Sequence, residues 1–222
     1  MRVSSGALAA FLVLCLAGPL AAQELREDSF KWYVGAQGGV LLFESQTQDR
    51  TGIPMGGAHV LVLAKRAALQ ISVEEGFGSD EISAYGDPLA PNGFRPVSFG
   101  RLRKYSATLM AFPLRNSNVE PFFGVGFGIL HTVNTEVGGT FTSPLEAAIA
   151  DSEARDRGSS GFGSLVVGVQ GGVSTLVRLF AQWQVTTSPA AGKLLVGPSH
   201  SLTGGFRVSL GSAKEGIRGG GY

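Results

Sequence analysis

The chain has 222 residues, enough for one or two domains, and its formal net charge of +1 argues against a nucleic-acid partner, which usually requires a basic excess. Only 16% of the residues are charged, whereas a soluble protein carries about 25%. The mean hydropathy is +0.19, yet after residue 22 no apolar run approaches the ~18 residues of a membrane helix. Two classes of protein remain compatible with this composition: a protein with a large buried core and a membrane β-barrel.

The first 22 residues have the pattern of a secretory signal peptide. Arg2 supplies the positive charge, residues 7–16 are apolar, and two alanines end at the predicted cleavage site after Ala22. The one cysteine of the chain, Cys15, lies inside this segment, so the mature chain would hold no disulfide and no reactive thiol. We expect an exported protein that begins with a short lead, residues 23–30.

Eight segments of the mature chain alternate between apolar and small or polar residues, the period of two that is typical of β-strands. In chain order the predicted strands are 31–43, 55–64, 67–77, 101–112, 120–130, 161–173, 177–187 and 201–210. The fifth is the clearest, because Phe123, Val125, Phe127 and Ile129 are separated by single glycines. Over this stretch one face of the strand carries large apolar side chains, and the other carries only glycines. This pattern is typical of a small closed barrel whose exterior faces lipid.

The connections between these strands alternate in length. Connections one, three, five and seven are the larger ones (44–53, 78–99, 132–160 and 188–199), and the others are short (65–66, 113–118 and 174–175). A barrel inserted from one side has this parity, because its odd connections emerge outside and its even ones inside. We therefore predict an all-β fold, an eight-stranded antiparallel up-and-down transmembrane barrel over 31–211, with a polar glycine-rich tail over 212–222. Within connection five, 144–156 is compatible with a short helix in an otherwise exposed and mobile segment.

These patterns resemble the small eight-stranded outer-membrane barrels, the class of the OmpA transmembrane domain, OmpX and the opacity-like proteins. The resemblance rests on Trp32-Tyr33-Val34-Gly35, on Glu120-Pro121-Phe122-Phe123-Gly124-Val125-Gly126 and on Gly204-Gly205-Phe206-Arg207-Val208-Ser209-Leu210. It implies a monomeric, porin-like protein of the bacterial outer membrane, surrounded by lipid and lipopolysaccharide and inserted by the barrel-assembly machinery. Members of this class end on an aromatic residue of the last strand, whereas here twelve residues follow Leu210.

Five charged residues are expected to face the lumen, because a charge facing lipid at mid-membrane costs about 2–4 kcal/mol. Glu74 and Lys104 fall near the outer ends of strands three and four, and Glu120, Arg178 and Arg207 near the inner ends of strands five, seven and eight. We interpret them as a lumen charge cluster. Either it is a salt-bridged plug that closes the barrel to solutes, or its members are simply packed and solvated lumen side chains.

Three arginines lie around the outer end of strand four: Arg95, Arg101 and Arg103. Guanidinium groups at this level are suited to charge-assisted hydrogen bonds with the phosphates of lipopolysaccharide. A solvated rim without a lipid partner is the alternative interpretation.

No set of residues predicts catalysis, a metal site or a cofactor. A lipid A deacylase would need a histidine and a serine on one strand face, whereas His200 and Ser201 are adjacent and face opposite ways. His59 and His131 have no partner at the spacing of a metal site. We expect a protein that is not an enzyme.

Three functions remain open. The favoured one is a structural or surface-interaction barrel that presents its long connections outside the cell. The alternative is a small pore or hydrophobic-ligand channel, because the glycine-lined lumen leaves room for a solute, although eight strands normally enclose a filled lumen. A soluble periplasmic carrier of lipocalin-like shape would need the apolar face turned inward, and the low charge fraction argues against it.

Overall fold

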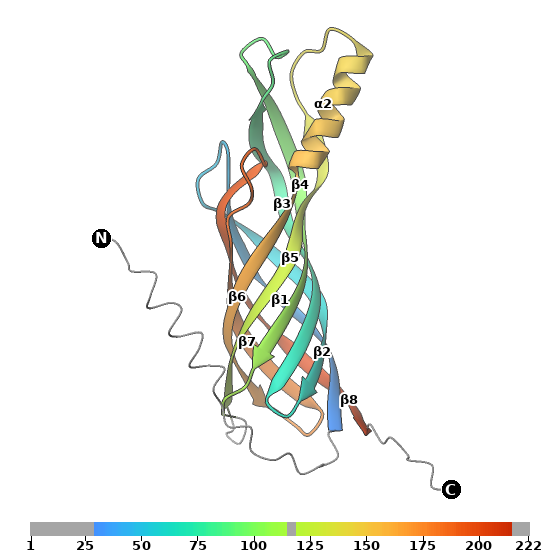
Figure 1. Cartoon of the computed structure of the whole chain (residues 1–222), viewed down its shortest axis with the longest axis vertical. Helices are drawn as coiled ribbons and strands as arrows, with labels where there is room; N and C mark the ends of the chain where they lie inside the picture. The colour runs from blue at the N-terminus through green and yellow to red at the C-terminus, as the bar shows by residue number, and fades with distance from the viewer. Residues whose placement is uncertain (1–28, 115–118, 215–222) are drawn as a thin grey trace, which may run out of the picture.

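The computed structural model describes residues 29–114 and 119–214, so the predicted signal peptide lies outside the described residues. Eight antiparallel strands form a closed barrel in which each strand pairs with its neighbours in the chain and β8 closes onto β1 (Figure 1). The strands are β1 (Ser29–Ser45), β2 (Thr51–Ala64), β3 (Ala67–Gly86), β4 (Phe94–Ala111), β5 (Val119–Val137), β6 (Ser159–Gly172), β7 (Val177–Thr186) and β8 (Leu195–Lys214). Helix α2 (Pro144–Arg157) lies between β5 and β6. The predicted eight-stranded up-and-down barrel is confirmed.

The long and the short connections lie at opposite ends of the barrel (Figure 1). One end carries α2, the β3–β4 hairpin and the β1–β2 and β7–β8 connections, and we call it the outer end. The other carries the tight turn at Lys65 and Arg66, and we call it the inner end. The first strand also begins there and the last one ends there, since Ser29 pairs with Lys214. This separation is the parity expected of a barrel inserted from one side.

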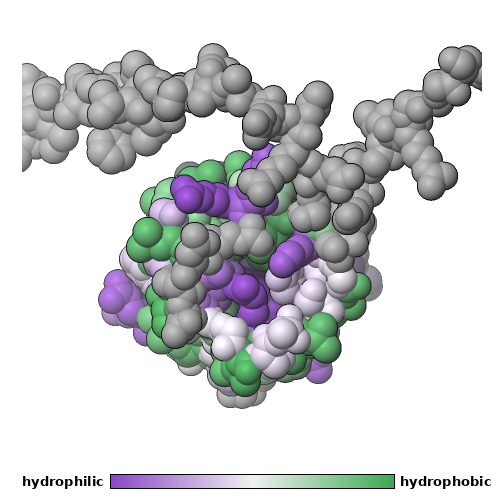
Figure 2. Space-filling model, turned by 90° about the horizontal axis from the view of Figure 1, so that it is seen from below, coloured by the Kyte–Doolittle hydropathy of each residue, from purple (hydrophilic) through white to green (hydrophobic). Residues whose placement is uncertain are grey.

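The exterior of the barrel is apolar. On β5, Phe123, Val125, Phe127 and Ile129 are each between 51% and 72% exposed, as predicted for a lipid-facing row. Seen from the inner end, hydrophilic side chains lie in the middle of the barrel, and many hydrophobic side chains lie around the rim, with hydrophilic and neutral ones between them (Figure 2). A lipocalin-like carrier would need the reverse arrangement, so the structure argues against that alternative.

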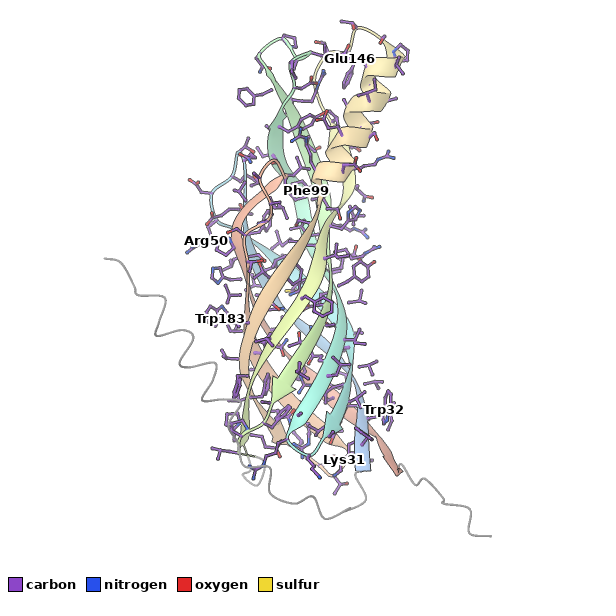
Figure 3. The ribbon with its side chains drawn as sticks, in the orientation of Figure 1. Lys31, Trp32, Arg50, Phe99, Glu146 and Trp183 are labelled. Atoms are coloured by element: carbon purple, nitrogen blue, oxygen red, sulfur yellow. The ribbon has the colours of Figure 1, made fainter. Side chains whose placement is uncertain are left out.

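Two tryptophans lie outside the barrel at different heights (Figure 3). Trp32 is near the inner end, and Trp183 is closer to the outer end, where its ring stacks on His200 with centroids 5.8 Å apart. Both indoles are more than 40% exposed. Aromatic side chains at two levels on either side of an apolar band are typical of the two membrane interfaces.

Two segments predicted to be connections, 78–99 and 132–160, continue the neighbouring strands for part of their length. The β3–β4 pairing extends to Gly86 and Phe94, and β5 continues to Val137. The pairing of β3 with β4 shifts register between Phe77 and Glu81, and beyond this irregularity the residues that face inward change from even to odd numbers on both strands. Because such a bulge reverses the faces of a strand, the period-of-two pattern could not be followed across it.

Strand β8 is also longer than predicted. It begins at Leu195, inside the predicted connection 188–199, and runs to Lys214, so 212–214 of the predicted tail pair with β1. Glycines with positive φ stand near both ends, Gly197 (φ 67°) and Gly211 (φ 108°). Beside these glycines the alternation of apolar and polar residues is interrupted. The strand predicted from that alternation was therefore too short at both ends.

Helix α2 begins and ends with ordinary capping residues. The Ser143 hydroxyl accepts a hydrogen bond from the Glu146 backbone N–H at 3.2 Å, and Pro144 occupies the first turn. Basic residues Arg155 and Arg157 lie in the last turn, where they complement the helix dipole. Among the described residues no helix has the length and apolar character needed to cross a membrane.

Two of the glycines that face the lumen make room for aromatic rings. A Cβ atom added to Gly128 would come within 3.0 Å of the Phe162 ring, and one added to Gly168 would come within 3.0 Å of the Phe122 ring. The space that these glycines leave is therefore filled by neighbouring side chains. At these positions the lumen glycines leave no room for a solute.

Candidate functional site

A buried ion pair crosses the upper lumen. Glu74 of β3 and Lys104 of β4 are direct partners in the sheet register, and Lys104 Nζ lies 2.8 Å from Glu74 Oε2. Gln37 Nε2 donates to the same carboxylate at 2.6 Å, while Lys104 Nζ donates to Gln184 Oε1 at 2.9 Å and to Ser201 Oγ at 3.2 Å. The pair thus connects five strands across the lumen.

A second polar layer lies closer to the inner end. Arg178 Nη1 donates to Glu120 Oε2 at 2.5 Å, and Gln170 Nε2 donates to the same oxygen at 2.8 Å. Arg207 is fully buried and donates to Gln170 Oε1 at 2.6 Å and to Gln70 Oε1 at 2.8 Å. The five charged residues predicted for the lumen therefore all lie inside the barrel, but they form two separate layers rather than one cluster.

The histidine in the apolar second strand belongs to this inner layer. His59 Nε2 accepts a hydrogen bond from Arg207 Nε at 3.2 Å, and the imidazole ring meets the Phe180 ring edge-on with centroids 5.2 Å apart. The sequence shows no partner for His59 at the spacing of a metal site, and it does not predict this contact with Arg207. The two residues are 148 positions apart, and no local pattern connects them.

Apolar side chains fill the lumen on both sides of the Glu74–Lys104 pair. The cluster toward the outer end comprises Leu41, Phe43, Ile53, Met55, Phe99, Leu102, Leu130, Phe162 and Leu195. The cluster toward the inner end comprises Tyr33, Leu61, Leu63, Ala68, Met110, Phe112, Phe122, Val166 and Phe180. The cavity beside Phe43 and Leu195 measures only about 10 Å³, roughly the space of one water molecule. Side chains therefore occupy this narrow lumen, as expected for eight strands.

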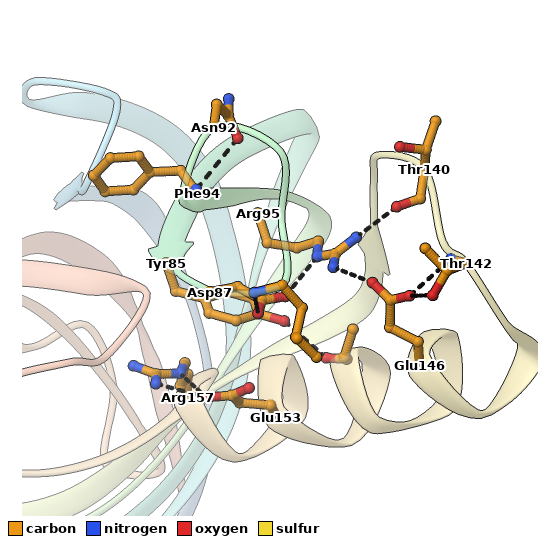
Figure 4. Close-up of polar contacts among 12 residues, drawn as sticks. Tyr85, Asp87, Asn92, Phe94, Arg95, Thr140, Thr142, Glu146, Glu153 and Arg157 are labelled. Atoms are coloured by element: carbon orange, nitrogen blue, oxygen red, sulfur yellow. Dashed lines mark hydrogen bonds and ion pairs between the residues drawn. The ribbon is translucent and has the colours of Figure 1, made fainter.

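At the outer end, Arg95 joins the β3–β4 hairpin to α2 (Figure 4). Arg95 Nε lies 2.8 Å from Asp87 Oδ2, Nη2 lies 2.9 Å from Glu146 Oε1, and Nη1 donates to the Thr140 carbonyl at 3.1 Å. The guanidinium carbon also lies 4.5 Å from the centroid of the Phe141 ring. Only 1% of this side chain is exposed, which corrects the expectation that Arg95 contacts lipopolysaccharide. We call this arrangement the Arg95 latch.

The latch is charged at neutral pH. The Leu89 backbone N–H and the Arg95 guanidinium hold the pKa of the Asp87 carboxyl below its usual value. The Thr142 hydroxyl and backbone N–H, together with Arg95, hold the pKa of Glu146 below its usual value as well. Burial opposes the charge on Arg95, but hydrogen bonds to the two carboxylates raise its pKa.

A second set of contacts holds the middle and the end of α2. Tyr85 donates its hydroxyl hydrogen to the Ala150 carbonyl at 3.2 Å, and burial raises the pKa of this phenol. The Arg157 guanidinium lies 4.9 Å from the centroid of the Tyr85 ring, pairs with Glu153 at 2.7 Å and donates to the Gly192 carbonyl at 2.8 Å. The segment expected to be exposed and mobile is instead a helix bonded to the β3–β4 hairpin and to the β7–β8 connection.

A cavity of about 400 Å³ lies between the outward connections. We call it the outer pocket, and its lining includes Gln46, Tyr85, Phe94, Arg157 and Lys193. These side chains combine two aromatic rings, two cations and an amide, and they come from all four connections at this end or from the strand ends beside them. No sequence pattern indicates the pocket, because its members are scattered over almost 150 residues.

The other two predicted arginines lie on the exterior of β4. Arg101 Nη1 and Arg103 Nη2 each donate to Glu75, at 3.2 Å to its two different carboxylate oxygens. Their side chains are 50% and 36% exposed. The structure places them together on the outer wall, and a contact with lipid stays a prediction.

The adjacent histidine and serine of β8 face opposite sides of the wall. Ser201 points into the lumen toward Lys104, and His200 stacks on Trp183 outside. The described residues contain no group of three His, Cys, Asp or Glu side chains that could hold a metal ion.

The fold is shared with known outer-membrane proteins. The crystal structure of Neisserial surface protein A (NspA) matches 80% of this chain and 96% of its own, with a TM-score of 0.54 and 16% sequence identity. The chain has the fold of the small eight-stranded barrels of the bacterial outer membrane. No family model and no curated protein matches the sequence.

Two structures of Ail, the attachment invasion locus protein of Yersinia pestis, match 82% of this chain and 99% of their own. Their sequence identities are 9% and 11%, with TM-scores of 0.38 and 0.40, and the first is a complex with the heparin analogue sucrose octasulfate.

Proposed function

We propose that this protein is an integral outer-membrane barrel with a closed lumen, whose outer end binds a ligand outside the cell. The outer pocket is the observation that carries this proposal. Residues of the β1–β2, β3–β4, β5–β6 and β7–β8 regions converge on one cavity, at the end opposite to the short turns.

The walls of the pocket are held in place before any ligand arrives. Tyr85 and Arg157 line the cavity and also belong to the contacts that fix α2. Lys193 is tied to the same helix through a 2.6 Å hydrogen bond from its Nζ to the Asp156 carbonyl. Because a preformed site loses less conformational entropy on binding, this arrangement supports recognition of a specific ligand.

The lining favours a polar, negatively charged ligand. Arg157 and Lys193 supply N–H donors suited to carboxylate or sulfate groups, and Gln46 supplies an amide. Phe94 is 61% exposed and offers an apolar face on which a sugar ring can stack. An acidic saccharide combines these features, and it is the ligand class that the pocket supports best.

The same barrel gives little support to the alternative of a pore. Apolar clusters lie on both sides of the Glu74–Lys104 pair, and the rings of Phe162 and Phe122 fill the space beside lumen glycines. We therefore assign the lumen charges a structural role.

The test uses the full mature chain, folded into lipid nanodiscs and checked by its heat-modifiable gel mobility. Calorimetry then compares a sulfated oligosaccharide with its desulfated counterpart. We expect only the sulfated form to bind, and we expect Lys193→Ala and Phe94→Ala each to weaken binding about tenfold. Arg155 of α2 is exposed and does not line the pocket, so Arg155→Ala is the matched control. Equal binding of both oligosaccharides, or equal affinity in all variants, would contradict the proposal.

A further inference from the structure

We propose that the outer wall of β3, β4 and β5 holds one phosphorylated, acylated lipid of the outer leaflet, with the chemistry of lipid A. Its phosphate would lie on Arg101 and Arg103, and an acyl chain would occupy an apolar groove below them. This site is separate from the outer pocket. It depends on the barrel being embedded in the outer membrane, but not on the pocket having a ligand.

The register of the three strands places the two arginines directly above an apolar surface. Starting beside the β3–β4 register shift and moving toward the inner end, five consecutive rows of outward-facing residues cross β3, β4 and β5. The rows are Phe77–Arg101–Val133, Glu75–Arg103–His131, Val73–Tyr105–Ile129, Ile71–Ala107–Phe127 and Leu69–Leu109–Val125. The first two rows carry the charges, and the next three contain no charged residue. The change from one to the other marks the level at which lipid headgroups meet acyl chains.

The charged rows keep an excess of positive charge. Arg101 and Arg103 share one carboxylate, that of Glu75, and each uses one N–H for it. A guanidinium carries five N–H donors in a planar fork that fits phosphate oxygens. Two guanidinium groups opposite a single carboxylate therefore form a site for a further anion, and both are accessible from the exterior.

A groove runs along the middle of the apolar rows, where Ala107 is much smaller than its neighbours. Ala107 lies between Ile71 and Phe127 in its row, and the larger neighbours stand on either side of it. The groove begins with a hollow of about 310 Å³ beneath Arg103, bordered by Tyr105 and Ile129 among others. It continues into a second hollow of about 260 Å³, which shares Ala107 and Phe127 with the first.

The length of this groove matches one leaflet. From Arg103 to Leu109 the strand advances six residues, or about 20 Å at ~3.3 Å per residue. With a strand tilt of roughly 40°, this corresponds to about 15 Å along the membrane normal, half of a hydrocarbon core of ~30 Å. An acyl chain lying in the groove would thus reach the middle of the bilayer while its phosphate stays at the arginines.

Native mass spectrometry of the folded full mature chain tests the site. The protein is released from detergent micelles doped with hexa-acylated lipid A, or with the same lipid after removal of its phosphates. We expect one retained molecule of phosphorylated lipid A per barrel and about tenfold weaker retention of the dephosphorylated lipid.

Two kinds of variant examine the two halves of the site. The double variant Arg101→Ala/Arg103→Ala should weaken retention of phosphorylated lipid A about tenfold and remove the preference for phosphate. Ala107→Trp should fill the groove and weaken retention of both lipids. Matched controls are Arg66→Ala, an exposed arginine at the inner end, and Ala181→Trp, an exposed alanine on β7. Heat-modifiable gel mobility verifies that every variant folds.

Two results would overturn the proposal. In one, Arg66→Ala reduces retention as much as the double variant does, which indicates general attraction to a cationic barrel. In the other, Ala107→Trp and Ala181→Trp both retain lipid A like the wild type, which indicates that no acyl chain occupies the groove.

Discussion

Arg95 and Glu146 are 51 residues apart in the chain, yet their side chains meet at 2.9 Å at the outer end of the barrel. Their contact ties a strand of the wall to helix α2, which no sheet hydrogen bond holds. Because Asp87 binds the same guanidinium from the β3–β4 hairpin, one buried arginine organises the two longest projections. The hairpin and the helix are therefore fixed relative to each other, so the outer end can keep a binding surface in place.

Removal of the latch should loosen α2 without affecting the barrel wall. Arg95→Ala leaves Asp87 and Glu146 without their shared cation, so we expect several-fold faster amide hydrogen exchange across 144–157 and unchanged exchange in β6 and β7. Hydrogen-exchange mass spectrometry in nanodiscs measures both regions. Arg155→Ala removes an exposed arginine whose charge only complements the dipole of the same helix, so it should raise the exchange much less than Arg95→Ala does. Equal exchange in the two variants would show that the latch does not hold the helix.

The latch should also open at low pH. Both carboxyl pKa values lie below their ordinary values of 3.8 for Asp87 and 4.5 for Glu146, so ionisation stabilises the folded latch. This stabilisation is fully present above the ordinary values and is lost as the pH falls through the lowered ones. We expect exchange in 144–157 to be constant from about pH 7 to about pH 5, after correction for the intrinsic rate, and to rise only when the pH falls below the ordinary values of both carboxyls. If 144–157 already lost its protection from exchange between pH 7 and pH 5, groups other than Asp87 and Glu146 would control the opening.

The ion pair in the lumen should matter for stability rather than for closure. Glu74→Ala leaves the Lys104 ammonium buried with only neutral partners, which typically costs about 3–5 kcal/mol in free energy of unfolding. Glu74→Leu/Lys104→Met, which removes both charges, should recover most of this loss. Urea unfolding in lipid vesicles, followed by tryptophan fluorescence, gives the comparison.

The same Glu74→Ala variant separates the two interpretations of the lumen charges. The apolar clusters above and below the pair remain in place, so we expect planar-bilayer conductance to stay at the wild-type baseline. Steady channel openings in Glu74→Ala alone would identify the ion pair as the plug, and the lumen would then be a gated path.

Lumen glycines should be intolerant of a methyl group, unlike those of the exterior. A Cβ on Gly128 would collide with the Tyr105 backbone carbonyl and with the Phe162 ring, so Gly128→Ala should destabilise the barrel by about 1–3 kcal/mol through overpacking. Gly161 lies on the exterior in the next strand, and a Cβ added there would stay 3.9 Å from its nearest neighbouring atom, so Gly161→Ala is the matched control. Urea unfolding in vesicles measures the difference, and equal stabilities would mean that the lumen has spare room at Gly128.

The barrel wall was predictable because its evidence is local in the chain. Side chains of a strand alternate between two faces, so the row from Phe123 to Ile129 already identified the lipid-facing side of β5. The alternation of long and short connections then determined the topology and the two ends. The inward placement of Glu74, Lys104, Glu120, Arg178 and Arg207 followed from the cost of a charge in lipid, which depends on a single position and not on its partner.

The outer end depended on the tertiary structure. A register shift in the β3–β4 hairpin reverses which residues face inward, and it turns Arg95 from a predicted rim residue into a buried one. The partners of Arg95 and the lining of the outer pocket come from connections that only barrel closure brings together. The sequence by itself determined the strands of the wall and which of their residues face lipid or lumen, because periodicity and polarity can be assessed at each position separately. Only the folded barrel decided which distant side chains meet, because such contacts depend on register and closure.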